Sequence, residues 1–143
     1  MPAEDVVVGI DLGTSVVKSV AFDRSGRPVA FARRPNTFGI PHPGWAECDM
    51  EVVWKLVRET LCELVQDLSA GPHSVPALGV TGNMGGAWLT DGAKRPLRPA
   101  ILWNDGRAAG VLTRWLRDLE PDSFAKARRL FFAKDWVRFK LTG

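Results

Sequence analysis

The sequence predicts an α/β fold, a mixed sheet with three antiparallel strands at the start and helices packed on the sheet. Three observations support this. Apolar runs at 6–10, 16–22 and 28–33 are joined by short turns, so they are antiparallel neighbours. Apolar residues recur every three or four positions over 50–68, which indicates an amphipathic helix. The apolar run 75–80 follows that helix, and a strand reached through a helix is expected to pair in parallel.

Size and composition are those of one packed domain. The chain has 143 residues, of which 45% are hydrophobic and 24% charged, and its net charge is +3. The positive residues are scattered, which does not indicate a nucleic-acid surface. No apolar run reaches membrane-spanning length, and the acidic start is unlike a signal peptide. Two cysteines, Cys48 and Cys62, indicate no disulfide scaffold. We therefore expect a cytoplasmic protein with no nucleic-acid partner and no membrane contact.

Prolines, glycines and a helix-capping aspartate predict where the elements in the middle of the chain begin and end. Segment 35–49 holds three prolines and two glycines, so regular structure is not expected there. Asp49 is placed to cap the helix that follows, and the Ala-Gly-Pro segment 70–72 is expected to stop it. Two strands are predicted next, 87–89 and 97–102, and the proline in the second makes one of them an edge strand.

The chain from Ala108 to the end is predicted to be helical, with an interruption at 118–121. Asp122 or Ser123 is expected to cap a segment that runs to Leu130. A last helix is expected over 133–141. The glycine at residue 143 is a helix stop signal and is expected to end it.

The turn between the first two strands groups residues suited to a phosphate and its metal ion. Gly13 has no Cβ to block backbone approach, backbone N–H groups of such turns bind anions, and Thr14 and Ser15 add hydroxyls. Asp11 is an oxygen ligand suited to Mg²⁺, and Lys18 follows on the second strand. A plain hairpin turn explains the same residues equally well. The chain has no P-loop and no Rossmann glycine pattern, so those nucleotide sites are not supported.

Two further polar stretches are candidates for a polyhydroxyl ligand. Gly-rich segment 82–86 follows the fourth strand, where ligands of such sheets collect, and its Asn83 offers both donor and acceptor. A flexible turn is the alternative for this stretch. Segment 103–107 combines an aromatic wall with an amide, a carboxylate and a guanidinium, which suits a sugar. Its alternative is helix capping by Asn104 or Asp105, with Arg107 as a surface charge.

Taken together and in order, these motifs resemble the FGGY carbohydrate kinase family, in particular its xylulose-kinase-like branch. The resemblance is carried by the segments 9–18, 43–49, 79–84, 97–107 and 134–143. It implies a ribonuclease-H-like domain of the actin and sugar-kinase type, with 1–143 as an incomplete amino-terminal kinase domain. It also implies ATP-dependent phosphoryl transfer to a hydroxyl of a sugar or polyol, with a pentulose-like substrate favoured.

The resemblance also implies roles for single residues. The residues expected to line the ATP phosphates are Gly13, Thr14, Ser15 and Lys18. Asp11 is expected to serve the Mg²⁺ through water. The residues expected along the sugar pocket, or on a second stretch near it, are Asn83, Met84, Gly85, Trp103, Asn104, Asp105 and Arg107.

The chain departs from the family pattern at three places. The xylulose branch usually has His at the position of Gly85, and its loss removes a sugar contact. The chain between Arg107 and Trp115 is shorter than the pattern, with a junction near 109–110. Family members are several times longer, so the catalytic aspartate and the second domain are expected beyond Gly143.

These departures leave more than one function to consider. A chain of these residues alone is expected to lack kinase activity, while the full-length protein has it. One alternative is a non-catalytic nucleotide- or sugar-binding module of the same fold. Another is a structural domain whose turn at Asp11 binds nothing. The oligomeric state is open, and a homodimer is the assembly considered.

Overall fold

A computed structural model of the chain describes residues 4–68, 73–109 and 112–143. Its main feature is a four-stranded sheet in the order β3-β2-β1-β5. The strands are β1 (Glu4–Leu12), β2 (Val16–Phe22), β3 (Pro28–Pro35) and β5 (His73–Gly82). The first three are antiparallel neighbours and β5 runs parallel to β1, which confirms the predicted mixed sheet.

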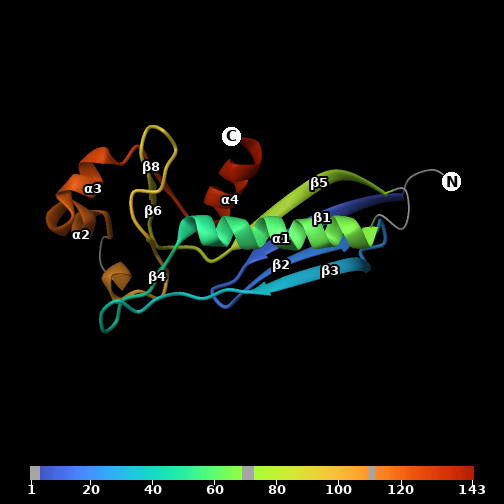
Figure 1. The fold of residues 1–143 in the computed structure, drawn as a ribbon, viewed down its shortest axis with the longest axis horizontal. Helices are drawn as coiled ribbons and strands as arrows, with labels where there is room; N and C mark the ends of the chain where they lie inside the picture. Colours follow the sequence, from blue (N-terminus) through green and yellow to red (C-terminus); the bar gives the residue numbers. More distant parts are fainter. Residues whose placement is uncertain (1–3, 69–72, 110–111) are drawn as a thin grey trace.

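Helix α1 (Met50–Leu68) lies along one face of this sheet (Figure 1). The residues of β1 that alternate toward it are all buried: Val6, Val8, Ile10 and Leu12. The predicted cap forms, because Asp49 Oδ1 accepts hydrogen bonds from the backbone N–H of Glu51 at 2.8 Å and of Val52 at 3.3 Å. The predicted helix stop, 70–72, lies outside the described residues.

The other face of the sheet is open to solvent among the described residues. Val7 and Phe31 are exposed there, although both alternate with buried neighbours. Asp11 follows Ile10 and precedes Leu12, so its side chain projects from this open face together with that of Lys18. Strand alternation therefore places the two predicted charges on the side away from α1.

A second layer of short elements extends beyond one end of the sheet (Figure 1). Strand β4 (Glu47–Cys48) pairs with β7 (Ala100–Ile101), and β6 (Trp88–Thr90) pairs with β8 (Arg129–Phe131), all antiparallel. The predicted strand over 97–102 is thus only two residues long, and it pairs with a segment that was expected to be irregular. Single backbone contacts still join it to β6, such as the bridge between Ala87 and Ile101.

The helical prediction for the chain from residue 108 onward, interrupted at 118–121, is wrong at β8. The helices are η1 (Gly106–Ala109), α2 (Leu112–Leu119), α3 (Pro121–Lys126) and α4 (Ala133–Thr142). β8 is a strand because it pairs with β6, about forty residues earlier in the chain. The sequence of three residues alone does not indicate such a pairing. The predicted cap of α3 is also wrong. Glu120 precedes that helix and Pro121 occupies its first turn, where the fixed φ of proline suits a helix start.

Helix α4 joins the two layers. Trp136 is fully buried, and its indole N–H donates to the carbonyl of Met50 at 3.2 Å. The predicted stop of this helix is confirmed. Gly143 has a φ of +80°, and its N–H donates to the carbonyl of Phe139 at 2.8 Å. None of the described helices combines the length and the apolar character needed to span a membrane.

The two cysteines are not paired with each other. Cys48 is buried and Cys62 is exposed, and both are free thiols, as the sequence indicated. Burial raises the pKa of the Cys48 thiol to about 12, so the group is protonated at neutral pH.

Candidate phosphate and sugar site

The candidate site forms where β1 and β5 end. The parallel register pairs Asp11 with Thr81 and Leu12 with Gly82. A Cβ on Gly82 would lie 2.8 Å from the Cβ of Leu12, so the two strand ends approach closely. The turn after β1 and the loop after β5 therefore leave the sheet side by side, although about 70 residues separate them in the chain.

The turn after β1 is held from within and from β3. The N–H of Gly13 donates to the carbonyl of Val16 at 3.0 Å, and a Cβ at Gly13 would lie 2.7 Å from that oxygen. Only glycine fits there. Asn36 donates its side-chain amide to the carbonyl of Gly13 at 3.0 Å and its backbone N–H to the carbonyl of Ser15 at 2.8 Å. Asn36 was not predicted as a site residue from the sequence. The expected antiparallel pairing of the second and third strands was the available signal, since it brings the end of β3 beside this turn.

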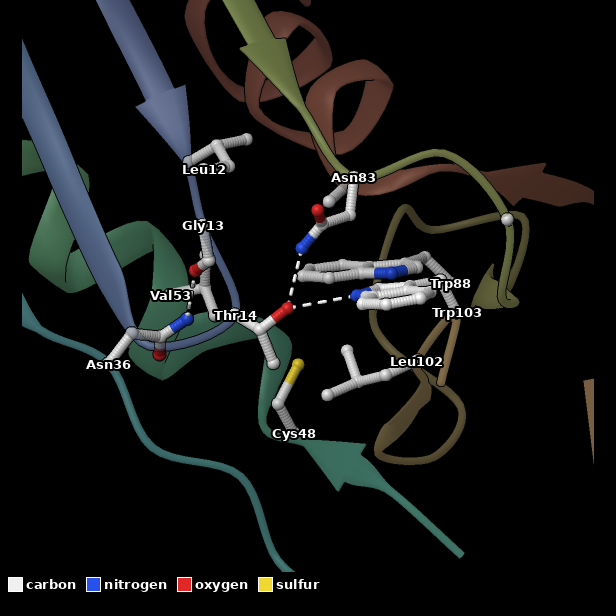
Figure 2. Close-up of a pocket in the computed structure, with 12 residues that line it drawn as sticks. Leu12, Gly13, Thr14, Asn36, Cys48, Val53, Asn83, Trp88, Leu102 and Trp103 are labelled. Atoms are coloured by element: carbon white, nitrogen blue, oxygen red, sulfur yellow. Dashed lines mark hydrogen bonds between the residues drawn. The ribbon is translucent and has the colours of Figure 1, made fainter. Parts of the chain in front are cut away.

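Three predicted residues from three segments meet at the hydroxyl of Thr14. Its Oγ1 accepts hydrogen bonds from the amide of Asn83 at 2.6 Å and from the indole N–H of Trp103 at 3.0 Å (Figure 2). The cavity behind them holds about 20 Å³, which is room for no more than a water molecule. The cavity is therefore too small for a sugar or a phosphate, and only the outer side of this triad has room for one, where Trp103 is 53% exposed.

Asp11 and Lys18 lie opposite each other in the register of β1 and β2 and form an ion pair of 3.2 Å. Their side chains are 45% and 44% exposed. They border a groove of about 450 Å³ on the open face of the sheet, with apolar walls that include Val7 and Phe22. A pair this exposed contributes roughly 0–1 kcal/mol to stability, so both charges are available to a ligand.

Asp105 and Arg107 are buried instead, at 3% and 8% exposure. Arg107 donates to Asp105 through Nε at 2.8 Å and Nη2 at 2.6 Å, and to Glu47 through Nη2 at 2.7 Å. Arg98 bridges Glu47 and Glu120. We call these five residues the ionic cluster. The alternative in which Arg107 is a surface charge is therefore wrong.

Aromatic rings close the ionic cluster. The guanidinium of Arg107 lies 3.6 Å from the ring centroid of Trp45 and 4.8 Å from that of Trp115. The capping alternative is confirmed for Asp105, whose Oδ1 accepts the N–H of Arg107 at 2.8 Å in the first turn of η1. Glu47 is a further residue that the sequence analysis left out of the site, although its segment carried part of the resemblance.

Burial and pairing oppose each other in the pKa values of the ionic cluster. Burial alone would raise the pKa of Asp105, but hydrogen bonds from Arg107 and from the N–H of Ala46 lower it below the ordinary value. Burial would likewise lower the pKa of Arg107, and its bonds to Asp105 and Glu47 raise it instead. Both groups are therefore charged at neutral pH, with their charges compensated inside the protein.

The remaining predicted residues lie around the triad without hydrogen bonds of their side chains to it. Ser15, Met84 and Asn104 are exposed. Gly85 has a φ of +89°, and a Cβ there would lie 3.5 Å from the Cβ of Trp103. Gly85 therefore leaves space beside Trp103, in a backbone conformation that a histidine adopts only with strain. Among the described residues, no cluster of three or more His, Cys, Asp or Glu could hold a metal ion.

Comparisons with known proteins agree with this geometry. The chain is 35% identical to the xylulose kinase of Escherichia coli (strain K12) over 95% of its own length and 33% of that protein. It is 29% identical to the erythritol kinase of Brucella abortus (strain 2308), over 97% of this chain and 32% of the relative. The chain thus spans about a third of the length of the curated relatives it matches.

A solved structure and a family model give the same assignment. The crystal structure of xylulose kinase from Rhodospirillum rubrum superposes with a TM-score of 0.86 at 28% identity, over 94% of this chain and 34% of that one. The fold is therefore the ribonuclease-H-like fold of the actin and sugar-kinase type. Residues 6–114 match the N-terminal domain of the FGGY family of carbohydrate kinases. With most of its length inside that match, the chain belongs to the FGGY family of carbohydrate kinases.

Proposed function

We propose that the full-length protein is an ATP-dependent kinase that transfers a phosphoryl group to a hydroxyl of a sugar or polyol, with a pentulose-like substrate favoured. The observation that carries this proposal is the triad at Thr14. It joins the turn suited to phosphates to the two loops suited to a polyhydroxyl ligand. Phosphoryl transfer depends on such positioning of donor and acceptor, together with neutralisation of charge.

On the donor side, we assign the ATP phosphates to Gly13, Thr14, Ser15 and Lys18. The exposed charge of Lys18 and the glycine turn support this assignment. Asp11 fits Mg²⁺ held through water, because that ion uses one or two carboxylates and completes its shell with water and phosphate oxygens. Mg²⁺ held there would neutralise charge on the phosphate oxygens.

On the acceptor side, we assign the sugar to the outer face of the triad. Asn83 and the exposed indole of Trp103 support this, with Met84, Gly85 and Asn104 around them. Asp105 and Arg107 belong to this side through the loop that they hold, since both are buried in the ionic cluster.

Four statements about the full-length protein remain predictions from the sequence. The proton acceptor is predicted in the segment beyond Gly143, and the shortened stretch near 109–110 borders residues that the structure does not describe. The cytoplasmic location and the homodimer are predictions too. The competing function is a non-catalytic binding module of the same fold. A protein of that kind would bind nucleotide or sugar and release no ADP.

A coupled assay of ADP release by the full-length protein tests the proposal. D-xylulose, L-xylulose, erythritol and glycerol are offered with ATP and Mg²⁺, and reactions without sugar or with EDTA are the controls. We expect ADP release that requires one of these acceptors and is abolished by EDTA. A chain of residues 1–143 is expected to release none. Absence of acceptor-dependent ADP release from the full-length protein, with nucleotide binding retained, would favour the binding module.

A further inference from the structure

The hydroxyl of Thr14 has its two acceptor positions filled and its proton unassigned. A threonine hydroxyl offers one donor and two acceptor positions. The amide of Asn83 and the indole N–H of Trp103 both donate to Oγ1, at 2.6 Å and 3.0 Å (Figure 2). An indole N–H can only donate, so its bond fixes Oγ1 as an acceptor. Among the described residues, no protein atom accepts the Thr14 proton. The proton is therefore free for an acceptor from outside the chain.

The two donors differ in how firmly they are held. Asn83 is partly buried at the end of β5, beside the close approach of Gly82 to Leu12. Trp103 is about half exposed, so fewer packing contacts hold its side chain in place than hold that of Asn83. A ligand against its face would restrict it to the geometry that donates to Thr14.

The backbone around Trp103 does not depend on this hydrogen bond. The N–H of Leu102 donates to the carbonyl of Ala46 at 2.9 Å, and that of Gly106 donates to the carbonyl of Gly44 at 2.7 Å. The ionic cluster fixes the same loop through Asp105, which accepts the N–H of Ala46 at 2.6 Å. The bond from Trp103 to Thr14 is thus an addition to a loop that is already anchored on both sides.

We propose that the triad of Thr14, Asn83 and Trp103 couples the two substrates, so that a sugar against Trp103 strengthens the binding of ATP through the hydroxyl of Thr14. The inference rests on the proposed function. A donor bond to Oγ1 withdraws electron density and makes the hydroxyl a better donor, because chains of hydrogen bonds polarise one another. The same bond orients the free proton toward a phosphoryl oxygen. Trp103 is in this scheme a positioning residue for the phosphate, in addition to a wall for the sugar.

The coupling is measured as the ratio of two dissociation constants in the full-length protein. The constant for a non-hydrolysable ATP analogue with Mg²⁺ is determined by calorimetry, without sugar and with a saturating amount of the acceptor that the ADP assay turns over fastest. The ratio is the constant without sugar divided by the constant with sugar. We expect sugar to tighten analogue binding in the wild type, which makes this ratio greater than one. Trp103→Phe keeps the apolar wall and removes the N–H, and it should reduce this ratio about two- to tenfold, the range for one neutral hydrogen bond. In Trp103→Phe, the dissociation constant of the analogue without sugar should change by a smaller factor than the ratio does.

Three further variants separate coupling from a loss of structure. Thr14→Ser keeps the hydroxyl and should keep the ratio, while Thr14→Val should bring it close to one. Trp54→Phe is the matched control, because this half-buried tryptophan on α1 packs against Arg58 and Lys140 and not against the triad, and its ratio should equal that of the wild type. Thermal unfolding of each variant verifies folding. A wild-type ratio of one in an active enzyme would overturn the coupling, and so would an unchanged ratio in Trp103→Phe. Absence of any turnover by the wild type would instead overturn the proposed function.

Discussion

The triad at Thr14 and the ionic cluster around Arg107 use similar polar groups in opposite ways. The charges of the Asp11–Lys18 pair beside the triad are about half exposed. The hydroxyl proton of Thr14 in the triad has no acceptor among the residues that the structure describes. In the ionic cluster, Asp105 accepts four hydrogen bonds, from the N–H of Ala46 and from Arg107. Arg107 lies against two tryptophan rings with 8% of its surface exposed. The two regions flank the same loop, 102–107.

This difference indicates a division of labour within the candidate site. Groups whose partners are all internal cost desolvation, and they recover it by fixing the positions of the segments that they join. Groups with unused hydrogen-bonding capacity at the surface contribute little to stability and are free to bind a ligand. The ionic cluster therefore holds the loop, and the triad presents it to substrates. Four variants test this division, from the largest expected effect to the smallest.

Removing Arg107 should destabilise the protein most. Arg107→Ala leaves Asp105 and Glu47 buried without their common partner, which costs about 3–5 kcal/mol when a buried pair is broken. Urea unfolding followed by tryptophan fluorescence measures the change. A free energy of unfolding within about 1 kcal/mol of wild type would contradict the structural role assigned to the ionic cluster.

Asp11→Asn should show the opposite pattern. We expect the turnover number of the full-length protein to fall at least about 100-fold, as when a group that stabilises transition-state charge is removed. Its stability should change by less than about 1 kcal/mol, because Asp11 pairs with Lys18 at an exposed site. The ADP assay and urea unfolding give the two values. Turnover within about threefold of wild type would place the phosphates elsewhere.

The ionic cluster should also make stability depend on acid. The pKa of Asp105 is lower in the folded protein than in the unfolded chain, so its contribution is complete above the unfolded value of about 3.9. That contribution is lost as the pH falls through the lower folded value. Stability of the wild type should therefore decline more steeply below pH 4 than that of Asp105→Asn, since the other carboxylates contribute equally to both. Parallel declines would contradict this assignment.

The smallest effect is expected at an exposed ion pair. Arg117 donates to Asp118 at 2.7 Å on α2, with both side chains half exposed or more. Arg117→Ala should change the free energy of unfolding by less than about 1 kcal/mol and leave turnover unchanged. It is the matched control for Arg107→Ala, since both remove an arginine paired with an aspartate. A loss as large as that of Arg107→Ala would show that burial is not what distinguishes the ionic cluster.

The sequence by itself determined the features that depend on local patterns. The strands β1 to β3, helix α1 with its Asp49 cap, the parallel β5 and the stop of α4 at Gly143 were all predicted from periodicity and capping residues. The turn at Gly13 was also predicted from a local pattern. A carboxylate, a glycine and two hydroxyls stand within five residues there.

Only the tertiary structure decided which polar residues share a partner. The residues of β8 were assigned to helix because the strand with which they pair, β6, lies about forty residues away and leaves no trace in the local pattern. Asn36 and Glu47 were left out of the site for the same reason, since their hydrogen bonds run to Gly13 and to Arg107 across the fold. Trp103 and Arg107 stand four residues apart in one motif, yet one is exposed and the other buried. Burial and pairing depend on contacts between distant segments, and a local pattern cannot contain them.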